Sequence, residues 1–266
     1  MISDRIKYLL DFCIGDGHLG KYMYSSGVRG GEGSYHYKLT HSKKQREYLF
    51  HKIGILNKLG FTGRLDEYEK SLNGKKFPMC EYNVHSDDDI KAAFKHIINK
   101  GRKAIDKHLL SIFDARSLAY WYLDDGSPNK TSKSSSSPGN GFRYYYTYPV
   151  PKLSQFRLYT YSFTLEEQNL IVGWMKEKFD ISANIIKTTR DGMYIKICEL
   201  SERQKFIKTI EKFVPTSMEY KISGILSYSG ISPIKTEKKE ISVCGERLNE
   251  KTPTDDSEGD ATVQEV

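Results

Sequence analysis

Hydrophobic residues recur at helical spacing in two segments that each end at an acidic residue followed by glycine. The first segment runs from Ile6 to Ile14 and stops at Gly15-Asp16-Gly17. The second runs from Leu118 to Leu123 and stops at Asp124-Asp125-Gly126. Since apolar positions three and four residues apart share one face of a helix, both segments predict buried helices that end at a carboxylate.

The signals that follow these two segments come in the same order in each half of the chain. A strand-like run leads to a helix with a capping box at its start, then to a hairpin turn, and then to another capped helix. The matched signals are Ser42 with Thr164 at the first helix starts, Asn73-Gly74 with Asp191-Gly192 at the turns, and Ser86 with Ser201 at the last helix starts. We therefore predict a duplicated αββαββ unit.

Composition excludes several classes of protein. Hydrophobic residues make up 38% of the 266 residues, which is enough for packed cores and excludes a wholly disordered chain. No run approaches the roughly 18 apolar residues of a membrane span, and the first residues lack the features of a signal peptide. Because Cys13, Cys80, Cys198 and Cys244 form no CxxC pair, we expect reduced thiols and an intracellular protein. The compartments that fit are the cytoplasm of a bacterial or virus-infected cell and an organelle.

The net charge of +7 is unevenly spread along the chain. Residues 231–266 hold five Lys and Arg against nine Asp and Glu, a net of −4, so residues 1–230 carry a net of +11. A basic body favours a polyanionic partner such as nucleic acid, with a solvated lysine-rich surface as the alternative. The acidic segment after it has no aromatic residue and predicts a disordered tail.

The two acids at the predicted helix ends are unfavourably placed. Helix carboxyl ends carry partial negative charge, which costs Asp16 and Asp125 up to about 1 kcal/mol each. A hard divalent cation such as Mg²⁺ would reverse the sign of this interaction, and it prefers carboxylate oxygen. For one acid alone, an exposed Asp-Gly turn is the alternative. No His or Cys spacing resembles a zinc site. His18 and His41 near these ends are expected to be neutral surface or half-buried residues, with a supporting role at the site as the alternative.

These segments resemble the two signature helices of LAGLIDADG homing endonucleases. The residues that carry the likeness are Leu9 to Gly17 and Leu118 to Gly126, and it continues in Thr160 to Glu167 and Met218 to Ile222. The first segment departs from the family pattern at Asp11, which stands where the family keeps a small residue. We therefore expect Asp11 to disturb close packing of the two helices.

The resemblance implies an α+β protein with a duplicated αββαββα homing-endonuclease fold, in which two pseudo-symmetric halves form a DNA-binding saddle. The expected parts are a first half over residues 1–110, a second half over 111–228 and the acidic tail over 229–266. By similarity, Asp16 and Asp125 bind Mg²⁺ or Mn²⁺ as catalytic acids. Lys103 and Lys221 match the family's basic catalytic residues.

The function implied by the resemblance is that of a monomeric, site-specific homing DNA endonuclease, which makes Mg²⁺-dependent double-strand breaks in a long recognition sequence. Two alternatives share the fold: an intron-encoded maturase with intron RNA as its partner, and a catalytically inactive DNA-binding regulator. We expect no membrane partner. The residues expected to contact DNA alternate along predicted strands or flank a turn. They are His36, Lys38 and Thr40 in the first half, and Gln155, Arg157, Tyr159, Lys187 and Arg190 in the second.

Overall fold

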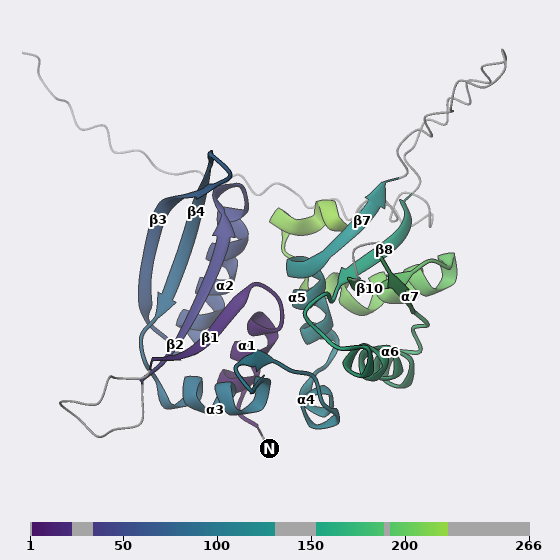
Figure 1. The fold of residues 1–266 in the computed structure, drawn as a ribbon, viewed down its shortest axis with the longest axis horizontal. Coiled ribbons are helices and arrows are strands. Elements are labelled where there is room, and N and C mark those ends of the chain that lie inside the picture. The colour runs from purple at the N-terminus through teal and green to yellow at the C-terminus, as the bar shows by residue number, and fades with distance from the viewer. Residues whose placement is uncertain (1, 23–33, 131–152, 189–191, 223–266) are drawn as a thin grey trace, which may run out of the picture. The chain divides into compact units, whose positions relative to one another are not determined.

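The computed structural model describes residues 2–22, 34–130, 153–188 and 192–222, all within the first of two units, residues 1–233. In this part of the chain, the order α-β-β-α-β-β-α occurs twice (Figure 1). The duplication predicted from the order of the sequence signals is therefore confirmed. None of the helices in the described ranges is long and apolar enough to span a membrane.

The first half is a four-stranded antiparallel sheet with its helices. Its elements are α1 (Asp4–Cys13), β1 (Gly17–Tyr22), β2 (Ser34–Ser42), α2 (Arg46–Lys58), β3 (Gly63–Leu72), β4 (Lys75–Val84) and α3 (Asp88–Ile97). The strand order is β1-β2-β4-β3. Asn73 and Gly74 join β3 to β4 with φ values of 50° and 73°, the left-handed pair that an Asn-Gly hairpin turn requires.

The second half repeats this plan with shorter strands. Its elements are α5 (Ala115–Asp125), β7 (Gly126–Lys130), β8 (Leu153–Tyr159), α6 (Leu165–Phe179), β9 (Asn184–Lys187), β10 (Met193–Ile197) and α7 (Leu200–Ile210). The strand order is β7-β8-β10-β9, which matches the first sheet. Phe156 and Leu158 of β8 are buried with Ile195 and Ile197 of β10, so the residues between them form the opposite face of this sheet.

A short hairpin and a short helix connect the halves, and the sequence pattern did not predict them. They are β5 (Ile98–Asn99), β6 (Arg102–Lys103) and α4 (Lys107–Ile112). Glu167 of α6 accepts hydrogen bonds from Arg102 Nη1 and from the Ile105 backbone N–H, each at 3.0 Å. The connection is thereby held against the second half.

Three of the four predicted helix starts are wrong, and that of α3 is off by one residue, because Asp87 and not Ser86 is its N-cap. Thr164 does cap α6, because its hydroxyl and the Glu167 carboxylate each accept a backbone hydrogen bond in a full capping box. Ser42 makes no such bond: residues Lys43–Gln45 form a 3₁₀ turn, and α2 begins only at Arg46. Likewise, α7 begins at Leu200, before Ser201. In terms of structure, Gln45 before α2 therefore corresponds to Thr164 before α6.

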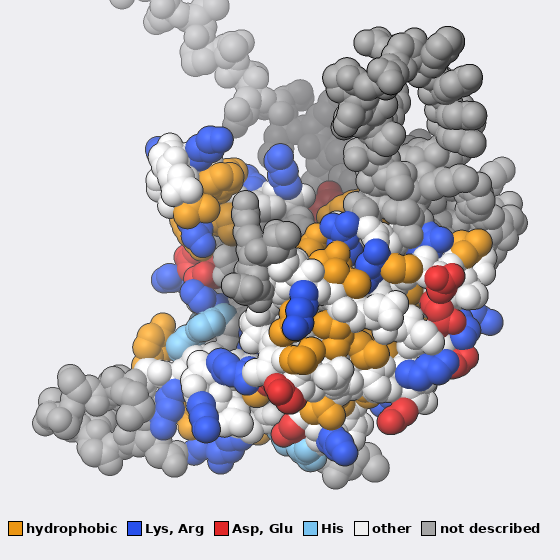
Figure 2. All heavy atoms as spheres, turned by 45° about the vertical axis from the view of Figure 1, so that its right-hand side comes forward, with side chains coloured by type: hydrophobic (Ala, Val, Ile, Leu, Met, Phe, Trp, Pro, Cys, Tyr) orange, Lys and Arg blue, Asp and Glu red, His pale blue; other side chains and the backbone are white. Residues whose placement is uncertain are grey.

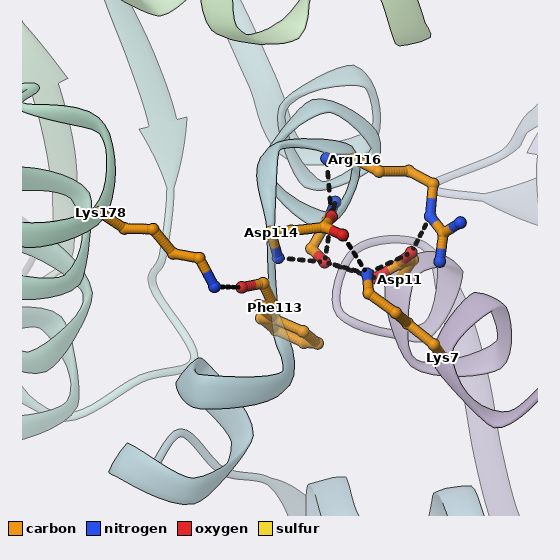
Figure 3. Close-up of polar contacts among 7 residues, drawn as sticks. Lys7, Asp11, Phe113, Asp114, Arg116 and Lys178 are labelled. Carbon is orange, nitrogen blue, oxygen red and sulfur yellow. Dashed lines mark hydrogen bonds and ion pairs between the residues drawn. The ribbon is translucent and has the colours of Figure 1, made fainter. Parts of the chain in front are cut away.

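Helices α1 and α5 lie side by side between the two sheets (Figure 1). The rings of Phe12 and Tyr120 meet edge to face at a centroid distance of 4.7 Å. Asp11 does not disturb this packing, because polar groups surround it (Figure 3). Its carboxylate accepts hydrogen bonds from Ser117 Oγ at 2.5 Å and Arg116 Nε at 2.7 Å, while Lys7 Nζ lies 3.3 Å away. The buried carboxylate of Asp11 therefore has three polar partners, and these offset the cost of burying it between the helices.

Candidate active site

The two acids that end the signature helices lie at matching places in the fold. Asp16 stands between α1 and β1, and Asp125 is the last residue of α5 before β7. The glycines after them begin strands. A Cβ on Gly17 would lie 2.5 Å from the Phe12 carbonyl oxygen, and one on Gly126 would lie 2.3 Å from that of Tyr122. Glycine is needed here for close approach to the preceding helix, since Gly126 has an extended backbone with φ −91° and not the left-handed conformation of a C-cap.

The carboxylates of Asp16 and Asp125 repel each other. Burial raises the pKa of Asp16 to about 6, and the negative charge of Asp124 adds to the rise. Burial raises the pKa of Asp125 to about 7, with the charges of Asp16 and then Asp124 adding to it. A divalent cation placed between two such groups would relieve their repulsion and match their hard oxygen ligands. The residues present therefore fit Mg²⁺ or Mn²⁺.

A third carboxylate, Asp124, is already paired. Its side chain is fully buried, and its two oxygens accept hydrogen bonds from Lys52 Nζ at 2.7 and 2.9 Å. It also accepts one from the Asp16 backbone N–H at 3.1 Å. Burial opposes ionisation of Asp124, but the adjacent Lys52 charge outweighs it and lowers the pKa of this carboxyl. Lys52 of α2 in the first half thus holds a residue of the second signature helix.

Gly15 provides the space for that contact. A Cβ on Gly15 would lie 2.4 Å from the Cβ of Asp124 and 2.5 Å from its Oδ2. Asp124 and Gly15 occupy equivalent positions in the two signature segments, one residue before each terminal acid. The space between the two segments holds only one side chain at these positions. Because Gly15 has no side chain, the Asp124 side chain fits there.

His41 completes a group of three candidate ligand residues. One of its ring nitrogens and one carboxylate oxygen each from Asp16 and Asp124 all lie within 4.8 Å of one another. Burial lowers the pKa of His41 to about 3, and the Lys52 charge contributes in the same direction. The imidazole is therefore neutral at physiological pH, as expected from the sequence.

The two predicted catalytic lysines cap the carboxyl ends of the signature helices. Lys103 Nζ donates to the Gly15 carbonyl oxygen. Lys221 Nζ donates to the carbonyls of Leu123 at 2.6 Å and Gly126 at 2.8 Å. A cation at a helix carboxyl end satisfies carbonyls that have no helical partner and opposes the helix dipole. The structure thus brings both lysines next to the two acids, and burial lowers the pKa of Lys221.

Residues predicted to contact DNA from the first sheet share its outer face. Their neighbours, Tyr37, Leu39 and His41, are buried on the other face. Lys38 Nζ lies 3.3 Å from a Glu81 carboxylate oxygen, and Thr40 donates to the same oxygen at 2.9 Å. His36 stacks on Tyr22 at a ring distance of 4.1 Å. This face therefore carries acidic as well as basic groups.

On the second sheet, Arg157 and Tyr159 share the outer face with Tyr194 of β10. The guanidinium of Arg157 lies 5.4 Å from the Tyr194 ring centre, and its buried Nε has no hydrogen bond to any described residue. Gln155 is buried, whereas Lys187 is exposed. Arg190 lies outside the described residues. Figure 2 shows Lys and Arg side chains spread over the visible face, with Asp and Glu between them.

Two buried residues near the acids, Lys52 and Asp124, were not assigned roles from the sequence. A signal for Lys52 was available, since it lies on the apolar face of α2 among residues that are otherwise hydrophobic. These are Tyr48, Leu49, Ile53 and Leu56. A lysine on such a face must find a buried partner.

Comparison with known proteins gave a family match. The model of the LAGLIDADG DNA endonuclease family matches residues 12–206, a range that contains Asp16, Lys103 and Asp125. A comparison with curated proteins gave no match.

Solved structures with a similar fold include two endonucleases bound to DNA. The homing endonuclease I-WcaI bound to its DNA recognition sequence has a TM-score of 0.64 and 17% identity, over 84% of this chain and 88% of that one. I-SmaMI bound to uncleaved DNA target in the presence of calcium ions has a TM-score of 0.52 and 15% identity, over 86% and 92%. At these identities, the likeness establishes the α+β fold.

Proposed function

This chain belongs to the LAGLIDADG DNA endonuclease family, and from that membership we propose that it is a site-specific homing endonuclease. It recognises a long duplex sequence and hydrolyses one phosphodiester bond in each strand, with Mg²⁺ or Mn²⁺ as cofactor. The likeness to I-WcaI bound to its recognition sequence supports duplex DNA as the partner. Calcium ions in the I-SmaMI complex support a divalent cation.

The observation that carries the proposal is the pair of mutually repelling acids at the ends of two packed helices. Asp16 and Asp125 would hold the cation, because burial raises the pKa of both carboxyls and the charge of Asp16 raises that of Asp125 further. When bound, the cation supplies charge stabilisation to the scissile phosphate and lowers the pKa of water. In a regulator that only bound DNA, two carboxylates facing phosphate would weaken binding and serve no purpose.

The residues of the chain set the geometry for this chemistry. Lys103 and Lys221 hold the backbone that carries the acids. Their ammonium groups also place positive charge beside the position of the phosphate, where negative charge develops as the bond breaks. Because these donors are fixed before substrate binds, little reorganisation is needed during the reaction.

The outer sheet faces would contact the DNA. Arg157 is a candidate for base recognition, since it lies on this outer face and a guanidinium can donate two hydrogen bonds to the edge of guanine. Lys187 is exposed and suits a phosphate contact. Because both acids come from one chain, we propose a monomer as the active form. We also propose that it acts inside a cell.

The test is a cleavage selection with the full-length protein. It is incubated with a library of long duplex DNAs in Mg²⁺, and the cut ends are sequenced. We expect one recurring site that is cut in both strands. Absence of recurring ends in both Mg²⁺ and Mn²⁺ would refute the nuclease assignment. Selective duplex binding without cuts would then indicate a regulator, and selective binding of intron RNA would indicate a maturase.

Cation binding should depend on pH. At about pH 6, Asp125 is mostly protonated and Asp16 about half protonated, so protons compete with the cation. At about pH 8 both groups are ionised, and their repulsion lowers the stability of the free protein. We therefore expect Mg²⁺ to raise the midpoint of thermal unfolding more at about pH 8 than at about pH 6. In the Asp125→Asn variant this difference should largely disappear; equal shifts of the wild type at both pH values would contradict the assignment.

A further inference from the structure

The buried side chain of His41 lies between Asp16 and Lys52. Its Nε2 is 3.2 Å from Lys52 Nζ, and its Nδ1 is 3.4 Å from Asp16 Oδ2. Lys52 is in turn held by both oxygens of Asp124. These contacts determine which ring nitrogen carries the hydrogen.

The ammonium group of Lys52 has three hydrogens and no acceptor. Asp124 takes hydrogen bonds at both of its oxygens, and the remaining contact faces Nε2 of His41, so that nitrogen must accept. An imidazole that accepts at Nε2 carries its hydrogen on Nδ1. Nδ1 is buried and makes no hydrogen bond of regular geometry within the described residues. The Gln45 side chain also interacts with this imidazole, and that contact opposes the lowering of its pKa. The half-exposed Asp16 carboxylate is 3.4 Å away, and a small rotation of this carboxylate would allow Nδ1 to donate to it.

We propose that His41 is a positioning residue that donates from Nδ1 to the Asp16 carboxylate and fixes its orientation for the cation. This role rests on the proposed nuclease function. It also means that His41 is not a metal ligand through Nδ1, although the imidazole lies close to two carboxylates. A nitrogen that carries hydrogen has no lone pair to offer, and Asp124 is already engaged by Lys52 and by the Asp16 backbone.

Among the described residues, the second half has no equivalent of this arrangement. Gly17 pairs with Leu39 and Gly126 pairs with Leu158. Two residues further along each strand, His41 therefore corresponds to Thr160. The helix caps Gln45 and Thr164 keep the same spacing.

By this spacing, the buried apolar residue Ile171 corresponds to Lys52, and Gly15 corresponds to Asp124. All three members of the network are thus replaced by uncharged residues in the other half. The network of His41, Lys52 and Asp124 therefore positions Asp16 and not Asp125. We expect cleavage of the two DNA strands to depend on it unequally.

The first test measures cleavage of each strand separately, on the duplex obtained from the selection, with a different fluorescent label on each strand. His41→Gln removes the donor at the Nδ1 position, whereas His41→Asn keeps an amide nitrogen there. We expect His41→Gln to slow one strand by about ten- to a hundredfold and to leave the other nearly unchanged, so that nicked DNA accumulates. His41→Asn should restore most of the lost rate.

Several results would overturn the proposal. A folding defect would slow both strands equally, and a lost metal ligand would make His41→Asn and His41→Gln equally poor. The second test does not need cleavage: nitrogen-15 NMR of the free wild-type protein reports the His41 tautomer. We expect hydrogen on Nδ1 in the wild type and a shift toward Nε2 in Lys52→Met. Hydrogen on Nε2 in the wild type refutes the positioning role, while failure of the wild type to cut any duplex refutes only the nuclease function.

Discussion

Replacing Asp16 or Asp125 by Asn reduces double-strand cleavage by about a thousandfold or more, while the protein stays folded and binds its duplex. The amide keeps the shape of the side chain but lacks the charge that holds a divalent cation, whose contribution to catalysis is several kcal/mol. Stability should be unchanged or higher, because burial already raises the pKa of both acids. Single-turnover cleavage in Mg²⁺, duplex binding in Ca²⁺ and thermal unfolding measure the three effects.

A matched control removes one negative charge elsewhere. Glu177→Gln changes an exposed side chain on α6, and it should leave cleavage and binding as in the wild type. If the Asn variants cut within about tenfold of the wild-type rate, the two acids do not hold the cation, and the proposed mechanism is wrong.

Replacing Asp11 by Ala lowers the free energy of unfolding by about 3–5 kcal/mol. The substitution leaves Arg116, whose side chain is only 14% exposed, without its carboxylate. Lys7, whose side chain is 13% exposed, keeps only its ion pair with Asp114 at 3.0 Å. Ser117 also loses the acceptor of its hydroxyl group. Urea unfolding of the full-length protein gives the change, and a loss below about 1 kcal/mol would mean that the network contributes little.

A second variant separates charge from packing. Asp11→Leu combined with Arg116→Met removes both members of the closest ion pair and keeps similar side-chain volumes. Apolar replacement of a whole buried pair is often neutral or stabilising, so this double variant should recover most of the stability lost in Asp11→Ala. An equally large loss in both variants would show that the shape of the network matters more than its charge balance.

Local patterns in the sequence accounted for much of the fold. Hydrophobic periodicity identified α1 and α5, and Asn73-Gly74 identified the turn between β3 and β4, because each signal depends on neighbouring residues alone. The start of α2 was misplaced for the same reason. Ser42 has the residue pattern of a capping box, but the chain forms a 3₁₀ turn there before the helix begins.

The candidate site was likewise predictable from the sequence only in part. The positions of Asp16 and Asp125 could be predicted, because both follow directly from the ends of periodic segments. The pairing of Lys52 with Asp124 could not, since the two residues are 72 positions apart and meet only when α2 of one half packs beside α5 of the other. The burial of Gln155 also depends on tertiary surroundings that strand alternation does not reveal.

Gly15 and Asp124, the different residues that precede the two terminal acids, restrict how this protein can be redesigned as a symmetric dimer of one half. A symmetric dimer made from two copies of the second half would bring two Asp124 side chains into a space that holds one, as the 2.4 Å approach to a Cβ on Gly15 shows. Two copies of the first half would avoid that collision but would leave each Lys52 without a carboxylate. Gly15 and Asp124 therefore make the two halves complementary, so that neither can be exchanged for a duplicate of the other without further substitutions.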